Sequence, residues 1–230
     1  MIIKEHNMVH SFFDDWILMK NQMSRYNILS QSDTSPRFRS YLLAHVQNKG
    51  QLHAIVQTTC GHIFRHQQLL QSKSSYYVAC DVSTRTRYIC YKDIVMLDFD
   101  VGKADFASKE DILSYLTTEV KAKYPCIIHE TCHGYHCFLV DKRRQHNSFD
   151  TFMFLRSFRQ DPNYSLYCYI RGFSVRLTRK RDDDHTQPLY KVIHSTKPTS
   201  QSSVFMREMR QEIGVMFHYM DGGNETCLMK

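Results

Sequence analysis

The stretch Ile94-Val95-Met96-Leu97-Asp98-Phe99-Asp100 decides the fold, because it joins an apolar run to two acidic residues spaced two apart. A short apolar run of this kind is typical of a buried strand. Side chains alternate between the two faces of a strand, so Asp98 and Asp100 share one face. We therefore predict a strand over residues 94–100 that packs one face in the core and carries two carboxylates at its carboxyl end.

The residues after this strand alternate between helical and strand patterns. Ser108-Lys109-Glu110-Asp111 begins a helix in the manner of a capping box, and Pro125 ends it. Downstream we predict strands over 126–131 and 135–140, a helix over 149–158 that stops at Asp161-Pro162, and strands over 164–170 and 173–179 hinged at Gly172. The order β-α-β-β-α-β with one extra strand predicts an α+β fold with an RRM-like (ferredoxin-like) sheet.

The residues before this stretch carry weaker signals. Helical spacing occurs over residues 12–26 and 38–46, and a hairpin is predicted from strands over 76–80 and 86–91. We expect residues 1–90 to form an N-terminal α/β lobe packed on the sheet of a second lobe, residues 91–230, which ends in a helix over 204–220.

The predicted topology brings polar residues together. In a sheet with right-handed crossovers and strand order 4-1-3-2, the third strand begins beside the end of the first. His136 opens that third strand and should approach Asp98 and Asp100, and Asp161 should reach the same edge from the other side. Like charges at this spacing destabilise each other unless a cation neutralises them. A divalent metal site for Mg²⁺ or Mn²⁺ follows from the carboxylate oxygens.

A basic segment follows the predicted metal site and could balance a triphosphate. Its cationic residues are Arg171, Arg176, Arg179, Lys180 and Arg181. The whole chain of 230 residues has 30 Lys and Arg against 23 Asp and Glu, a net charge of +7, which favours a polyanionic partner. Its length excludes a long multi-domain machine.

The sequence also indicates where the chain works. No apolar stretch approaches the roughly 20 residues of a membrane-spanning helix, and the N-terminus lacks the order of a signal peptide. We expect no membrane partner and an intracellular, reducing location in the cytoplasm or nucleus. We interpret the 8 cysteines as reduced thiols.

Together these motifs resemble the archaeo-eukaryotic primase superfamily, which includes the PrimPol-type primase-polymerases. Its first motif, apolar residues before Asp-x-Asp, is similar to residues 94–100, and its Ser-x-His motif is similar to Gly134-Tyr135-His136, with Gly in place of Ser. Its third motif, an Asp with a downstream Arg and Lys, is similar to Asp161 with Arg176 and Lys180. The resemblance covers residues 90–181.

The resemblance implies a template-dependent nucleotidyltransferase, a primase or primase-polymerase. In such an enzyme Asp98, Asp100 and Asp161 bind two divalent metals and His136 contacts the phosphates of the incoming nucleotide. Further nucleotide contacts are expected from Gly134, Arg171, Arg176 and Lys180. The implied partners are a single-stranded DNA template, nucleoside triphosphates and a helicase or other replication protein.

Three other functions remain open from the residues. An RRM-like protein could bind RNA or single-stranded DNA without catalysis, although carboxylates on the first strand repel a phosphate backbone. A rolling-circle nuclease needs a histidine pair on one strand face, and His133 and His136 have the wrong spacing. An inactive primase relative could act in a replication complex. Zinc ligation at Cys60, His62 and His66 with Cys80 or Cys90 is less favoured than a structural role, because no Cys-x-x-Cys pair occurs.

Overall fold

The computed structural model of the protein describes residues 36–53, 55–56, 66–103, 106–178, 190–197 and 204–221. By its contacts the chain divides into two compact units, Met1–Phe64 and Arg65–Lys230. In the first unit the predicted helix at 38–46 is confirmed as α2 (Pro36–Ala44), which buries Leu42 and Leu43. The helix predicted over 12–26 lies outside the described residues.

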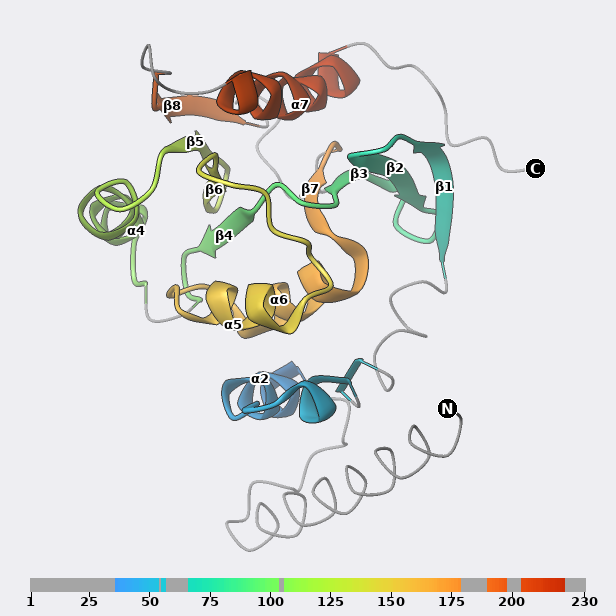
Figure 1. The fold of residues 1–230 in the computed structure, drawn as a ribbon, viewed down its shortest axis with the longest axis vertical. Helices are drawn as coiled ribbons and strands as arrows, with labels where there is room; N and C mark the ends of the chain where they lie inside the picture. Colours follow the sequence, from blue (N-terminus) through green and yellow to red (C-terminus); the bar gives the residue numbers. More distant parts are fainter. Residues whose placement is uncertain are drawn as a thin grey trace, which may run out of the picture. The chain divides into compact units, whose positions relative to one another are not determined.

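The second unit is an α+β structure with two four-stranded antiparallel sheets (Figure 1), which confirms the predicted fold class at this level. The first sheet has the order β1 (Gln67–Ser72), β2 (Tyr76–Asp81), β3 (Thr86–Tyr91) and β7 (Phe173–Arg176). The second has the order β4 (Met96–Asp100), β6 (Gly134–Leu139), β5 (Cys126–Glu130) and β8 (Lys191–Ser195). The hairpin predicted for the N-terminal lobe, β2 with β3, belongs to this second unit.

The order β4-β6-β5 matches the predicted order of the first, third and second strands of the sheet. Antiparallel pairing places Asp98 opposite His136 and Asp100 opposite Gly134. This register agrees with the burial pattern of β4, because Leu97 and Phe99 are buried while Asp98 and Asp100 on the other face are only partly covered. It positions the polar ends of the two strands side by side.

The strand predicted over 164–170 is wrong, because this segment lies in helix α6 (Pro162–Arg171). Aromatic residues such as Tyr164 favour strands on average, but the local signals for a helix start are stronger here. Asp161 is the N-cap and its side chain accepts a hydrogen bond from the Asn163 amide, while Pro162 takes the first helical turn, where no amide hydrogen is needed.

The strand after α6 also departs from the prediction. Gly172 ends the helix with φ of 95°, and a Cβ there would lie 2.7 Å from the carbonyl oxygen of Tyr91. This close approach brings β7 against β3, so that Ser174 pairs with Cys90 and Arg176 with Tyr88. The strand predicted over 173–179 therefore joins the first sheet and forms no ladder with β4.

Helices bury the apolar residues of the sheets. Helix α4 (Lys109–Tyr115) begins at the Ser108 cap and continues into the π-helical turn Leu116–Val120, and α5 (Phe149–Arg156) begins at Ser148. Both predicted helices are thereby confirmed. Phe99 of β4 is 1% exposed and packs edge-on against Phe106 and Tyr115. Each large apolar side chain buried in this way stabilises the fold by roughly 1.5–3 kcal/mol.

The C-terminal helix α7 (Val204–Asp221) is fixed by a polar contact. Arg143 donates to Asp93 at 2.8 Å and to Glu212 of α7 at 2.6 Å, and the Tyr91 hydroxyl donates to the Glu212 carbonyl at 3.0 Å. Met209, Ile213 and Met216 bury the apolar stripe of the helix in the core, as expected for a helix that packs along its length.

Two further observations concern membrane-spanning helices and cysteines among the described residues. None of the described helices is long and apolar enough to cross a membrane. Of the described cysteines, those at 90, 126, 132, 137 and 168 are free thiols as predicted. Cys80 is disulfide-bonded, which corrects the prediction for that residue.

Candidate active site

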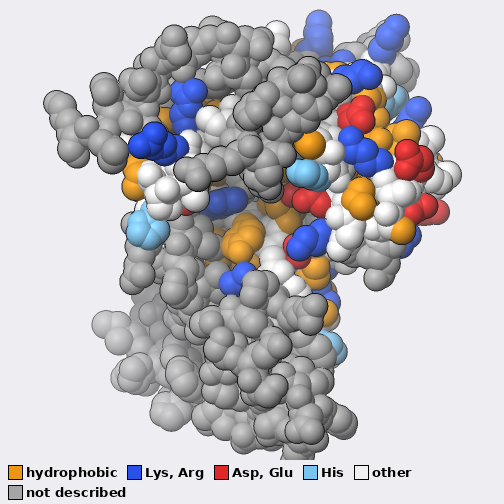
Figure 2. Space-filling model, turned by 180° about the vertical axis from the view of Figure 1, so that it is seen from behind, with side chains coloured by type: hydrophobic (Ala, Val, Ile, Leu, Met, Phe, Trp, Pro, Cys, Tyr) orange, Lys and Arg blue, Asp and Glu red, His pale blue; other side chains and the backbone are white. Residues whose placement is uncertain are grey.

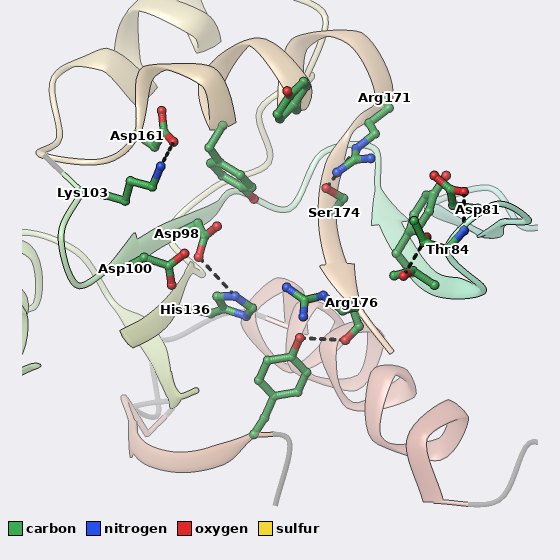
Figure 3. Close-up of a pocket in the computed structure, with 15 residues that line it drawn as sticks. Asp81, Thr84, Asp98, Asp100, Lys103, His136, Asp161, Arg171, Ser174 and Arg176 are labelled. Atoms are coloured by element: carbon green, nitrogen blue, oxygen red, sulfur yellow. Dashed lines mark hydrogen bonds and ion pairs between the residues drawn. The ribbon is translucent and has the colours of Figure 1, made fainter. Parts of the chain in front are cut away.

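A cavity of about 320 Å³ is lined by residues of both sheets and of α6 (Figure 3). Figure 2 shows acidic, basic and histidine side chains close together around a hollow on one face of the molecule. The lining residues are Asp81, Thr84, Thr86, Tyr88, Asp98, Asp100, Lys103, His136, Asp161, Tyr164, Tyr167, Arg171, Ser174, Arg176 and Tyr190. Six of the residues predicted to form the site are among them: Asp98, Asp100, His136, Asp161, Arg171 and Arg176.

The acidic wall is built by β4 and β6. Asp98 and Asp100 point to the same side of β4, and Nε2 of His136 lies 3.3 Å from Oδ1 of Asp98 (Figure 3). This contact follows from the register, because the two residues are directly opposite each other. The Asp98 side chain keeps 29% of its surface exposed and the His136 side chain 12%, so the carboxylate faces the cavity while the imidazole is mostly covered.

Asp161 reaches the cavity from the start of α6. Its Oδ1 accepts from the Asn163 amide at 2.9 Å, which is the N-cap contact, and its Oδ2 lies 3.7 Å from Nζ of Lys103. Lys103 follows β4 in a turn in which Gly102 adopts φ of 77°. One oxygen of Asp161 is thus committed to the helix and the other faces an ammonium group.

The basic wall comes from α6 and β7. The Arg171 guanidinium donates to the Ser174 hydroxyl at 3.2 Å and lies over the rings of Tyr88 and Tyr167, 5.0 and 5.5 Å from their centroids. Arg176 lies between these residues and His136 in the cavity (Figure 3). Two guanidinium groups therefore face the carboxylates across the cavity.

Tyrosines complete the lining. The ring of Tyr190 lies 5.0 Å from that of His136, and its hydroxyl donates to the Arg176 carbonyl at 2.7 Å. Burial raises the pKa of Tyr88 and of Tyr164 above the ordinary value, so both phenols stay protonated and neutral. His129 of β5 lies opposite His136 of β6. Burial, and then the charge of His136, lower the pKa of His129 to about 3.

Gly134 has a packing role at this site. A Cβ at Gly134 would lie 1.8 Å from the carbonyl oxygen of Phe99, so β4 and β6 approach too closely there for any side chain. The Ser-x-His motif to which this segment is similar therefore has no room for its serine at this position. Gly134 does not line the cavity.

Some predicted residues lie outside the described part of the chain. These are Arg179, Lys180 and Arg181, together with the candidate zinc ligands Cys60 and His62. Within the described ranges, no group of three or more His, Cys, Asp or Glu side chains could hold a metal ion. His66, Cys80 and Cys90 belong to those ranges, so they form no such group there.

No family model, no curated protein and no solved structure matches this chain. The interpretation of the cavity consequently depends on its own chemistry.

The donors of the acidic wall fit a hard divalent cation. Asp98 and Asp100 supply carboxylate oxygens on one strand face, which are ligands that Mg²⁺ and Mn²⁺ prefer. Mg²⁺ is commonly held by one or two carboxylates and completed by water and substrate phosphates. Two carboxylates opposite arginines therefore fit such an ion together with a phosphate ligand, although the described residues alone build no complete cage.

The sequence interpretation missed several lining residues. Tyr164 and Tyr167 are two of them. They recur at spacings of three and four with the predicted Arg171, so the three residues share one face of α6, and the Asp-Pro start would have indicated this helix. Lys103 carries no such signal, because its place in the cavity depends on the turn that follows β4.

Proposed function

We propose that residues 91–230 contain the catalytic core of a template-dependent nucleotidyltransferase of the primase-polymerase type. One observation carries the proposal: a single cavity opposes the carboxylates of Asp98 and Asp100 to the guanidinium groups of Arg171 and Arg176. A nucleoside triphosphate with its divalent cations has the complementary arrangement of charge.

In the proposed reaction, the 3′-hydroxyl oxygen of a growing strand attacks the α-phosphorus of a nucleoside triphosphate. The new P–O bond forms as the bond to pyrophosphate breaks, and the hydroxyl proton is lost to solvent. Asp98 and Asp100 would hold Mg²⁺ or Mn²⁺, with Asp161 assigned as third carboxylate, and the ion would supply Lewis acidity and neutralise charge on the phosphates. Arg171 and Arg176 bind the triphosphate, with Lys180 assigned to the same role.

His136 orients the phosphates in this proposal. Asp98 lies 3.3 Å from its Nε2 and holds the ring at the cavity wall. Nδ1 of His136 is buried, so Nε2 is the nitrogen that would donate to a phosphate oxygen, and this bond would replace or share its contact with Asp98. Its ring packs against Tyr190, which limits its rotation.

A finer assignment of the fold belongs to the same proposal. We infer a ferredoxin-like, RRM-like core in which β4, α4, β5, β6 and α5 supply the first five elements and β7 follows in the place of the sixth, although it pairs with β3. The order β4-β6-β5 supports it, as does the fact that β4 and β7 both line the cavity. The net charge of +7 supports single-stranded DNA as the template. A helicase or another replication protein is the proposed partner.

The test is primer synthesis and extension by the purified full chain on single-stranded DNA, with ribo- or deoxynucleoside triphosphates and Mg²⁺ or Mn²⁺. The double variant Asp98→Ala, Asp100→Ala should lose product by several orders of magnitude, since both carboxylates of the acidic wall are removed. The matched control is Asp150→Ala, an exposed carboxylate of α5 outside the cavity, which should keep wild-type activity.

The outcomes separate the competing functions. Metal-dependent product from the wild type and the control but not from the double variant supports the proposal. Equal product from all three proteins contradicts it, as does no product from any of them. Nucleic-acid binding that persists with a chelator and in the double variant, without synthesis, favours the non-catalytic RRM-like protein or an inactive relative.

A further inference from the structure

Gln160 lies beside the acidic wall but does not line the cavity. It is 5% exposed and joins α5 to α6, directly before Asp161. Its Oε1 accepts from the Asp98 amide at 3.2 Å. Its Nε2 donates to the Leu155 carbonyl at 3.2 Å and to the Ser165 hydroxyl at 3.1 Å. One buried carboxamide thus connects a strand and two helices.

The contact with Asp98 is explained by the position of β4 at the edge of its sheet. At the two ends of β4, Val95 accepts from Leu139 at 2.9 Å and Val101 donates to His133 at 3.0 Å. Backbone groups of successive residues alternate between the two sides of a strand. The amide of Asp98 consequently points away from β6, toward the side where β4 has no strand partner.

A buried amide without an acceptor is costly, so this edge needs one. In the predicted sheet the acceptor would come from the fourth strand, predicted over 164–170, but that segment lies in helix α6 instead. Gln160 supplies the acceptor at this point. Its side chain therefore accepts the hydrogen bond of the Asp98 amide, as the backbone of a neighbouring strand does elsewhere in the sheet.

We infer that Gln160 is a positioning residue that sets the spacing between the carboxylates of Asp98 and Asp161. Gln160 accepts a hydrogen bond from the backbone amide of Asp98 and is joined to Asp161 by a peptide bond. The contacts to Leu155 and Ser165 hold the carboxamide in place, so the backbone positions that carry the two carboxylates keep a fixed spacing. The inference depends on the proposed function only in assigning metal binding to these carboxylates.

The first experiment follows the backbone amide itself in the metal-free full chain, by hydrogen exchange and NMR. In Gln160→Met, a substitution that keeps an unbranched side chain but removes the amide, exchange at Asp98 should be about tenfold faster, the loss of one hydrogen bond. Leu97 and Phe99 face β6 and should exchange as in the wild type. Unchanged exchange at Asp98 overturns the inference.

The second experiment measures Mn²⁺ affinity by calorimetry. Gln160→Met should weaken Mn²⁺ binding by about tenfold, as is usual when a group that orients a metal ligand is lost. Ser165→Ala is the matched control, because it removes a buried hydrogen bond of the same carboxamide but leaves the bond to Asp98. Equal weakening in both variants indicates a general loss of stability and overturns the positioning role.

A second variant covers the case in which Gln160→Met does not fold. Gln160→Asn keeps the amide but is one methylene shorter, so it cannot reach all three partners, and faster exchange at Asp98 is again expected. Mn²⁺ binding without any synthesis, together with these effects, would contradict the proposed function but support the inference. Failure of the wild type to bind Mn²⁺ would overturn both.

Discussion

Gly134 offers the sharpest test of the site geometry. We predict that Gly134→Ser, which would restore the serine of the resembled motif, destabilises the protein. A Cβ at this position lies 1.8 Å from the Phe99 oxygen, 2.8 Å from the Phe99 carbonyl carbon and 3.0 Å from Cα of Asp100. All three are backbone atoms of β4, so no side-chain rotation relieves the contact.

The magnitude follows from these distances. An ordinary contact requires about 3.5 Å, so the strands must separate by roughly 1.5 Å at this point. Overpacking in a rigid core costs about 1–3 kcal/mol, and a clash with strand backbone belongs at the upper end. A loss of about 3 kcal/mol lowers the melting temperature of a chain of this size by roughly 6–12 °C. Asp100 moves with the strand, so weaker Mn²⁺ binding is expected in addition.

The assay is urea unfolding followed by far-ultraviolet circular dichroism. Gly134→Ala is measured beside Gly134→Ser, because the clash belongs to the Cβ and not to the hydroxyl. The matched control is Gly214→Ala on α7, where a Cβ has nothing within 4 Å, and a gain of up to about 1 kcal/mol is expected. A loss below about 1 kcal/mol for both Gly134 variants would refute the close approach of β4 and β6.

Three further predictions concern charge. Lys103→Met should strengthen Mn²⁺ binding several-fold in calorimetry, because its ammonium group lies 3.7 Å from Asp161 and competes with the cation. The pKa of His129 is about 3 in the folded protein against an ordinary 6.5, so the unfolded chain takes up this proton first as the pH falls. The free energy of unfolding should therefore decline between pH 6.5 and pH 3, by up to about 1.4 kcal/mol per pH unit. In urea titrations, His129→Asn should show a weaker dependence of this free energy on pH. Arg143→Met should cost about 2 kcal/mol in urea unfolding, since its partly covered contact with Glu212 at 2.6 Å is lost.

Each of these predictions has a control elsewhere in the described chain. Lys142→Met removes an exposed lysine outside the cavity and should leave Mn²⁺ affinity unchanged. His133→Asn alters an exposed histidine and serves as the control of the pH series. Removing Glu119 from the exposed pair Glu119–Lys123, whose atoms lie 2.8 Å apart, should leave the free energy of unfolding unchanged within error. If a control matches its test variant, the reasoning for that residue fails.

The parts of the fold with strong local signals were predictable from the sequence. The apolar run before Asp98 indicates β4, and the turn after β5 indicates the hairpin of β5 and β6. The topology of such a sheet then predicts His136 beside Asp98, where the pairing places it. The helix over 164–170 was not predictable in the same way, because tyrosine-rich segments are typical of strands. Only the Asp161 cap and the proline after it indicate a helix here.

The candidate site was predictable only where it lies on regular elements. The pairing of β7 with β3 depends on the chain reversal at Gly172, which a topology rule does not contain. Lys103 and Gln160 lie in connections between elements, where no periodicity shows the direction of a side chain. Their contacts with Asp161 and Asp98 become visible only in three dimensions.

The walls of the cavity belong to different sheets, with Asp98 and Asp100 on one and Arg176 on the other. Among the described strands, no ladder joins the two sheets. A phosphate ligand that touches both walls would act as a non-covalent cross-link between them. Because such a ligand favours the closed arrangement by mass action, separation of the sheets and ligand release become one thermodynamically linked event.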